Sequence, residues 1–295
     1  MWKDIKEFKS SDNNVSKFVF TCDTAVAEAV LYKYPTYEER TVICCSTQSG
    51  CPVGCVFCGT GKKFIRNLTA DEIVFQCEYI LKGLNIDTIK IRKLQLMFMS
   101  MGDPMLNLNE VANAIRSLNI KYPDAQLLIS TSAPKLDESV YDKFIELSKE
   151  IDKIGLQFSV HESTDENRKK LIPTKTNSLR DIANIGTKWF LATNRRPYFN
   201  YCVHDGNNTI DDVKRLSALF VANIWESTIS VICEKDETVA ASLDRQRDLA
   251  ENFSLLMLNA GYSVRVFNPA GQEDIGGGCG QLWFVQKWIK DHKKE

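Results

Sequence analysis

The sequence predicts an α/β fold of the (β/α) barrel type, closed or partial, in which parallel strands alternate with helices. From about residue 41 onward, short apolar runs of β-forming residues alternate with longer amphipathic segments. Alternation over five or six such units indicates parallel pairing with right-handed crossovers. The other fold with this pattern is a doubly wound sheet, but no G-x-G-x-x-G motif follows the first strand. The barrel is therefore the preferred interpretation.

Length and composition set the broad class of the protein. The chain has 295 residues, 44% of them hydrophobic, and a formal net charge of −1. These values exclude a disordered chain, a collagen-like fibre and a charge-driven tail protein. No apolar run approaches the ~20 residues of a membrane span, and the N-terminus lacks the apolar stretch of a secretory signal. We expect a cytoplasmic protein with no membrane partner.

The expected elements follow from hydrophobic periodicity. A helix begins after Thr69, where Thr-Ala-Asp-Glu forms a capping box, and further helices centre on 111–118, 140–147, 210–220 and 243–258. Before residue 41, the runs 17–21 and 27–33 predict a small hairpin or lid. We therefore expect an N-terminal β extension over 1–40 and a barrel domain over 41–295 that ends in a cysteine-bearing loop and a helix. The expected barrel strands are 41–45, 94–99, 126–131, 155–160, 198–203, 228–233 and 262–267.

Unusual motifs follow four of these strands. In barrels of this type, functional residues gather at the C-terminal ends of the strands. A cysteine cluster follows 41–45, Met-Gly-Asp-Pro follows 94–99, Ser-Thr-Ser ends 126–131 and Ser-Val-His ends 155–160. The sequence thus predicts one active-site mouth to which four strand ends contribute.

Ten cysteines are present, and half of them lie between Cys44 and Cys58. In a cytosolic chain, such clustering indicates metal binding or chemistry rather than disulfides. Cys51, Cys55 and Cys58 form a C-x3-C-x2-C triplet in a loop, which can hold three corners of a [4Fe–4S] cluster and leave one iron open. A zinc site would need a fourth ligand at zinc-like spacing. Simple packing fits poorly, because glycines and a proline make this segment a loop.

With Phe57 before its last cysteine, this triplet resembles the signature of the radical S-adenosylmethionine (SAM) superfamily. The resemblance implies a partial (β/α)6 TIM-type barrel with a short N-terminal β extension. It also implies that the open iron chelates SAM through its amine and carboxylate, and that reductive cleavage gives a 5′-deoxyadenosyl radical. The protein then has to position and shield the reactants.

A longer series of motifs resembles the RNA adenine methyltransferases of the RlmN/Cfr type. The match runs in order from about Glu28 to Leu282, almost the whole chain. It implies methylation of carbon 2 or 8 of an adenine in rRNA or tRNA, with an electron donor such as flavodoxin or ferredoxin. The motifs are Cys44-Cys45-Ser-Thr-Gln-Ser-Gly-Cys51, Arg66-Asn-Leu-Thr-Ala-Asp-Glu-Ile, Met99-Ser-Met-Gly-Asp-Pro, Ser130-Thr-Ser, Ser159-Val-His161 with Arg168 and Pro173, and Cys279-Gly-Gln-Leu.

The resemblance implies roles for two cysteines outside the triplet. Cys279 would take a methyl group from one SAM, and a radical from a second SAM would activate that methyl group for addition to adenine. Cys44 would then release the methylated RNA and form a disulfide with Cys279. The chemistry has a rationale, because the electrophilic carbon of adenine has no lone pair with which to attack SAM, and two thiols can make and resolve a tether. Gly276–Gly278 fit a mobile loop, although an ordinary glycine turn with an incidental cysteine is the alternative.

Other site residues also follow from the resemblance. Glu28 matches an acidic residue proposed to act on the adenine, although a solvated strand carboxylate is the alternative. Cys45 should point to the core, because neighbours on a strand face opposite sides, and the remaining Cys22, Cys77, Cys202 and Cys233 are expected to be small apolar fillers. For His161 the alternative is a core or rim histidine. The expected SAM-contacting residues are Gly102, Asp103, Ser130, Ser159, Val160 and His161.

Three departures from the family pattern bear on the substrate. The chain starts close to the catalytic segment, so we expect a shortened member without the usual N-terminal domain. Asp103 replaces the usual Glu, and the strand end Ile229-Ser-Val-Ile-Cys-Glu-Lys235 lacks the usual Asn. We therefore keep two alternatives: the same chemistry on a substrate other than rRNA (tRNA, a free nucleotide or a peptide), and a degenerate homologue without turnover.

Overall fold

One ten-stranded sheet organises the chain, in the order β1-β2-β3-β4-β7-β8-β9-β10-β11-β12. The computed structural model describes residues 2–61, 63–85, 87–231, 239–267, 274–278, 281–282 and 284–292, with side chains in α7 from residue 245 onward. The strands of this sheet are β1 (Asp4–Lys9), β2 (Val15–Cys22), β3 (Ala25–Lys33), β4 (Thr41–Cys45), β7 (Leu94–Phe98), β8 (Gln126–Thr131), β9 (Ile154–Ser159), β10 (Tyr198–Cys202), β11 (Glu226–Ser230) and β12 (Val264–Phe267).

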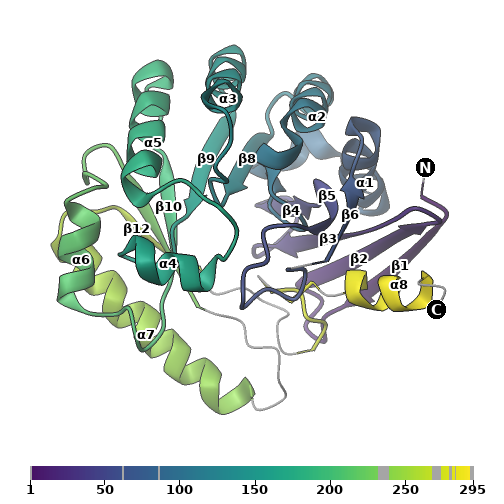
Figure 1. Cartoon of the computed structure of the whole chain (residues 1–295). Helices are drawn as coiled ribbons and strands as arrows, with labels where there is room; N and C mark the ends of the chain where they lie inside the picture. Colours follow the sequence, from purple (N-terminus) through teal and green to yellow (C-terminus); the bar gives the residue numbers. More distant parts are fainter. Residues whose placement is uncertain are drawn as a thin grey trace.

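In this sheet the neighbouring strands β4-β7-β8-β9-β10-β11-β12 all pair in parallel, as expected for a (β/α) barrel. Helices connect them and cover the convex side of the curved sheet (Figure 1). No helix in the described part of the chain has the length and apolar character to cross a membrane. The helices are α1 (Ala70–Gly83), α2 (Leu108–Lys121), α3 (Glu138–Glu150), α4 (Asp165–Leu171), α5 (Leu179–Thr193), α6 (Ile210–Ser217), α7 (Val239–Asn259) and α8 (Phe284–His292).

The N-terminal extension contains three antiparallel strands rather than the two expected. The additional strand, β1, has the sequence Asp-Ile-Lys-Glu-Phe-Lys, and its charges suit an exposed sheet edge but hide the strand pattern. β3 pairs antiparallel with β4, so the sheet continues across residue 40. The division of the chain at that residue stays a prediction.

Four further elements were not expected from the sequence: the hairpin of β5 (Gln48–Cys51) and β6 (Lys63–Asn67), and the helices α4 and α5. α5 carries a detectable pattern, because Ser178 begins a capping box and the buried residues that follow share one helix face. The β5–β6 hairpin is short and contains a bulge at Ser49 and Gly50, so period-two alternation is absent.

The apolar core lies on two sides of the sheet. The larger part fills the space between the sheet and the helices on its convex side. The smaller part lies where α8 packs against β3, and includes Val30, Tyr32, Val42, Leu282 and Val285. The second part matters for function because it fixes the C-terminal segment against the N-terminal extension, at the right of Figure 1.

Candidate active site

The three cysteines of the triplet lie in and beside the loop that connects β5 to β6. Cys51 ends β5, and all three thiols are half-buried. The Cys58 N–H donates to the carbonyl of Cys55 at 3.1 Å, and the Gly61 N–H donates to the carbonyl of Cys58 at 3.1 Å. A Cβ atom on Gly61 would lie 2.8 Å from the Cys55 carbonyl oxygen, so the tight turn requires glycine there. These bonds shape the loop that carries the three half-buried cysteines.

The loop supplies three thiols from one short stretch, the ligand set of a cubane iron–sulfur cluster with one open iron. In the described part of the chain, no three His, Cys, Asp or Glu side chains converge as they would on one ion. A cubane needs no such convergence, because each thiolate binds a different iron atom. Burial raises the pKa of Cys51 to about 12, and the backbone N–H groups of Val53 and Gly102 partly offset that effect. These N–H groups would stabilise a metal-bound thiolate.

The turn after β7 contacts β5, the strand before the cluster loop, through Gln48. Gly102 has a φ of +94°, a conformation that favours glycine, and a Cβ there would lie 2.6 Å from the Cβ of Gln48. The Gln48 Oε1 accepts a hydrogen bond of 2.9 Å from the Asp103 N–H. Gln48 is 1% exposed. The β7 turn expected to bind SAM is therefore packed against the strand that ends in Cys51.

Asp103 has more partners than the sequence suggests. Its carboxylate accepts hydrogen bonds from the Met105 N–H, the Thr131 hydroxyl, and both the N–H and the hydroxyl of Ser132, at 2.6–3.0 Å. Burial raises its pKa, and these hydrogen bonds oppose the rise. In the structure the carboxylate ties the end of β7 to the end of β8. A contact between Asp103 and the amine of SAM stays a prediction. The amine would have to bind carboxylate oxygens that already accept these hydrogen bonds.

His161 lies at the end of β9 and contacts the cluster loop. Its ring meets Phe57 edge to face, with 5.5 Å between ring centroids. Its backbone has a φ of +63°, which is uncommon for a residue other than glycine. Burial, with a contribution from the cation of Arg168, lowers the pKa of His161 to about 3. Among the described residues, the buried Nδ1 of the neutral ring has no hydrogen-bond partner, and a bound ligand can satisfy such an atom.

Arg168 fixes the ends of two strands. Its guanidinium donates to the backbone carbonyls of Ser132, Ser159 and Val160 at 2.6–3.1 Å. The side chain is 2% exposed, and burial lowers its pKa to about 10. Val160 is buried, and Ser159 is half-buried. Ser130 accepts a hydrogen bond of 3.2 Å from the Gln157 amide. SAM contacts by Ser130, Ser159 and Val160 stay predictions.

Cys44 and Cys45 face opposite sides of β4, as strand alternation predicts. Cys45 is fully buried among the residues beneath the helices, which confirms its place in the core. Cys44 is half-buried and packs against the smaller apolar cluster on the other side, with its thiol 3.9 Å from the sulfur of Met97. The thiol expected to react is thus the more accessible of the pair.

Cys279 lies outside the described residues, as do Cys233 and Lys235, but the chain on both sides of Cys279 is described. The Tyr32 hydroxyl donates to the Gly277 carbonyl at 2.7 Å. Beyond Cys279, the Thr60 hydroxyl donates to the Leu282 carbonyl at 2.5 Å. Tyr32 belongs to β3, and Thr60 belongs to the cluster loop. The chain before Cys279 is therefore attached to the N-terminal extension, and the chain after it is attached to the cluster loop.

Glu28 anchors the same segment. Its Oε1 accepts a hydrogen bond of 2.9 Å from the Phe284 N–H, and its Oε2 lies 3.6 Å from the Lys17 Nζ. The Lys17 ammonium also donates to the Gly276 carbonyl at 3.2 Å. Glu28 is 0% exposed, so the alternative of a solvated strand carboxylate is wrong. Burial raises its pKa to about 7, although the charge of Lys17 opposes the rise. A contact with adenine stays a prediction.

Lys17 was not predicted as a site residue. It is 2% exposed in the middle of β2, and burial lowers its pKa while Glu28 opposes the change. The recognisable pattern is a lysine inside an otherwise apolar run, facing a glutamate in the neighbouring strand. Buried charges of this kind need a partner. The ion pair bonds to the chain both before and after Cys279, at Gly276 and Phe284.

Comparisons with known proteins agree with this geometry. Residues 45–187 match the model of the radical SAM superfamily. The ribosomal RNA large subunit methyltransferase N of Nitrosopumilus maritimus is 32% identical over 290 residues, 95% of this chain and 80% of the relative. A probable dual-specificity RNA methyltransferase RlmN of Thermus thermophilus is 32% identical over 283 residues, 94% of this chain and 76% of the relative.

A solved structure confirms the expected fold. The radical SAM methyltransferase from Sphaerobacter thermophilus superposes with a TM-score of 0.74 at 24% identity, over 94% of this chain and 79% of that one. Two curated relatives above 30% identity are matched over more than three quarters of their length. The chain therefore belongs to the RlmN/Cfr-type family within the radical SAM superfamily.

Proposed function

We propose that this protein is a SAM-dependent methyltransferase that adds a methyl group to a ring carbon, C2 or C8, of an adenine in rRNA or tRNA. The observation that carries the proposal is the attachment of the Cys279 segment to the cluster loop through the bond from Thr60 to Leu282. The names of the relatives, which are RNA methyltransferases, support the same substrate class. A cytoplasmic location is part of the proposal.

The residues present fit the expected cofactors. Cys51, Cys55 and Cys58 would hold a [4Fe–4S] cluster, because one loop closed by backbone hydrogen bonds supplies three thiols, one for each of three iron atoms. Reduced by an electron donor such as flavodoxin or ferredoxin, the cluster would supply radical chemistry on bound SAM, with two SAM molecules used per turnover. Gly102, whose turn packs against Gln48, and His161, whose ring contacts Phe57, would contact SAM at this loop. The buried Nδ1 of His161, which has no hydrogen-bond partner within the described residues, would offer one polar contact.

Two thiols of this chain would handle the transferred carbon. The Cys279 sulfur would accept the methyl group of one SAM. That methyl group would lose a hydrogen atom to the radical derived from a second SAM, and its carbon would bond to the adenine ring carbon, which would lose its own hydrogen as a proton and return one electron to the cluster. The Cys44 thiolate would then attack the Cys279 sulfur. An S–S bond forms, the C–S bond breaks, and its electron pair goes to the carbon, which gains a proton and becomes the new methyl group. A two-electron reductant would return both thiols. The half-buried position of Cys44 suits this role.

The proposal is tested with SAM that carries a deuterated methyl group. The protein is reconstituted anaerobically with iron and sulfide, reduced, and incubated with rRNA and tRNA, and the digested nucleosides are analysed by mass spectrometry. We expect a labelled methyladenosine with the wild type and none with Cys279→Ala or Cys58→Ala. A variant of the core residue, Cys77→Ala, is the matched control and should stay active. Labelled methyl on another acceptor, or none at all, would contradict the proposal.

A further inference from the structure

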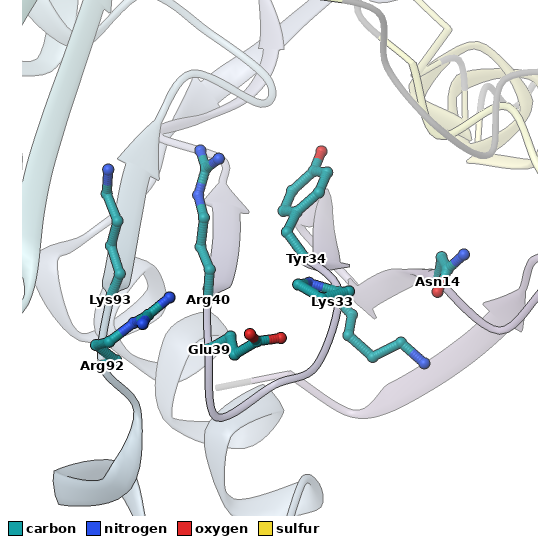
Figure 2. A pocket seen from close by; sticks show the side chains of 8 residues that line it. Asn14, Lys33, Tyr34, Glu39, Arg40, Arg92 and Lys93 are labelled. Carbon is teal, nitrogen blue, oxygen red and sulfur yellow. The ribbon is translucent and has the colours of Figure 1, made fainter.

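A basic pocket lies at the other end of the sheet from the cysteine loop. It has a volume of about 550 Å³ and is formed by the connection from β3 to β4 and by the residues before β7. Arg40 immediately precedes β4, and Lys93 immediately precedes β7, so both lie where the parallel strands begin. The pocket shares no lining residue with the site described above but adjoins it, because Tyr34 of the pocket stacks on Tyr32 with 6.1 Å between ring centroids. Its lining residues are Asn14, Lys33, Tyr34, Pro35, Glu39, Arg40, Arg92 and Lys93 (Figure 2).

The charge of the pocket is strongly unbalanced. Four cations line it, together with a single carboxylate, whereas the whole chain has a net charge of −1. In the part of the chain that the structure describes, none of these four cations forms an ion pair. Elsewhere on the surface, lysines and arginines do pair with carboxylates, as in Arg116–Glu150 and Lys188–Asp142. The pocket therefore concentrates positive charge that the protein does not neutralise itself.

The cations are also close to one another. Burial and the neighbouring Arg265 on β12 both lower the pKa of Arg40. Burial and Arg265 also lower the pKa of Lys93, and the charge of Arg40 lowers it further. Figure 2 shows Lys93, Arg40 and Tyr34 extending side by side into the pocket. Like charges at such short range repel one another, and a bound anion would relieve that repulsion.

Arg40 is held in position for an anion. Its Nε donates to the Gln95 side chain at 2.8 Å, and its guanidinium lies over the ring of Tyr34, 4.9 Å from the centroid. Within the described residues, its two terminal nitrogens have no hydrogen-bond partner and line the pocket. A guanidinium held by its Nε and by an aromatic ring can present both terminal nitrogens to one phosphate.

We propose that this pocket binds a phosphodiester group of the RNA substrate and thereby positions the RNA on the barrel. The proposal deepens the proposed function and rests on it. Phosphate contacts from lysine and arginine give nucleic-acid binding most of its affinity without reading sequence. Arg92 and Lys93 are exposed, so an RNA strand can reach them. Along β4, Arg40 is four residues before Cys44, about 13 Å at the rise of a strand. One RNA can thus contact the pocket and the reactive thiol together.

The test compares two double variants that lose the same charge. The first is Arg92→Ala with Lys93→Ala in the pocket. The second is Lys149→Ala with Lys188→Ala, two exposed lysines on α3 and α5 that already have carboxylate partners. Binding of a fluorescein-labelled RNA hairpin with adenines in its loop is measured at several salt concentrations. The melting temperature is recorded to confirm folding, since neither pocket side chain has a hydrogen bond to lose within the described residues.

We expect the pocket variant to bind RNA more weakly and to reduce the slope of log K against log salt by about 1.4, the value for two lost phosphate contacts on a single strand. The control should match the wild type. Equal affinity and slope in all three proteins would overturn the proposal. The proposal would also be overturned if RNA binding is unchanged while inorganic phosphate raises the melting temperature of the wild type but not of the pocket variant. That result would assign the pocket to free phosphate. The assay needs no turnover, so a failure of methyl transfer leaves its result intact.

Discussion

The buried ion pair of Glu28 and Lys17 gives the account its most quantitative prediction. Glu28 contacts the chain just after Cys279 through the Phe284 N–H, and Lys17 contacts it just before, at Gly276. Burial raises the pKa of Glu28 from 4.5 to about 7. The folded chain therefore binds this proton more tightly than the unfolded chain does, by about 3 kcal/mol.

The direction of the effect follows from which state holds the proton. Below pH 4.5, Glu28 is protonated in both states, and the folded state has its full advantage. As the pH rises through 7, the folded chain releases the proton and loses that advantage. His161 acts in the opposite sense, because its pKa is about 3 in the folded state and 6.5 in the unfolded state. The stability of the protein therefore falls as the pH drops below 6.5, where the unfolded chain binds the proton more tightly. A comparison with a variant is needed to separate the two.

The variant Glu28→Gln keeps an acceptor oxygen for the Phe284 N–H and removes the titratable carboxyl group. The free energy of unfolding of the apo protein is measured by urea denaturation between about pH 5 and pH 8, a range that spans the raised pKa. We expect the stability of the wild type to fall relative to that of Glu28→Gln by about 2–3 kcal/mol over this range. Glu146→Gln removes an exposed carboxylate and should parallel the wild type. A constant difference between Glu28→Gln and the wild type, or one that grows in the opposite direction, would refute the reasoning.

Three further predictions concern groups that shape the site. Gly61→Ala should lower the amount of iron bound on anaerobic reconstitution, because the new Cβ atom would clash with the Cys55 carbonyl of the loop. The control Gly83→Ala should bind iron as the wild type does, because a Cβ atom at Gly83 would have no neighbouring atom within 4 Å. Arg168→Lys should lower the free energy of unfolding by about 2–3 kcal/mol in urea, because the guanidinium donates five hydrogen bonds from a planar fork and an ammonium has only three donors on one atom. Full stability of that variant would contradict this account of the strand ends. Tyr32→Phe should cost about 1 kcal/mol and speed hydrogen exchange in 274–278, since it loses the bond to Gly277; unchanged exchange there would argue against the anchor.

Much of the fold could be predicted from the sequence because it depends on local periodicity. Six of the seven expected barrel strands lie within one or two residues of their observed limits at each end, and strand alternation placed Cys45 in the core. The capping box at Thr69 begins α1 as expected. The β5–β6 hairpin could not be predicted, because its four- and five-residue strands contain a bulge. The charged sequence of β1 hides its pattern for a different reason: it is a solvated edge.

The site was predicted as a set of residues but not as a network. Motifs identify Asp103, but only the tertiary structure brings three residues from the ends of β7 and β8 to its carboxylate. The partners of Glu28 are 11 residues before it, at Lys17, and 256 residues after it, at Phe284. A sequence pattern reports neighbours along an element, whereas these contacts depend on how distant elements pack.

The central claim is that Cys279 carries the transferred carbon and Cys44 releases it. The most direct test is to express Cys44→Ala with the components for cluster assembly, digest the purified protein, and analyse the peptide that contains Cys279 by mass spectrometry. The account predicts an adenine nucleotide joined through one carbon to Cys279, because the thiol that would resolve the link is missing. An unmodified Cys279 peptide from protein with an intact cluster, or a nucleotide joined at another residue, would contradict the claim.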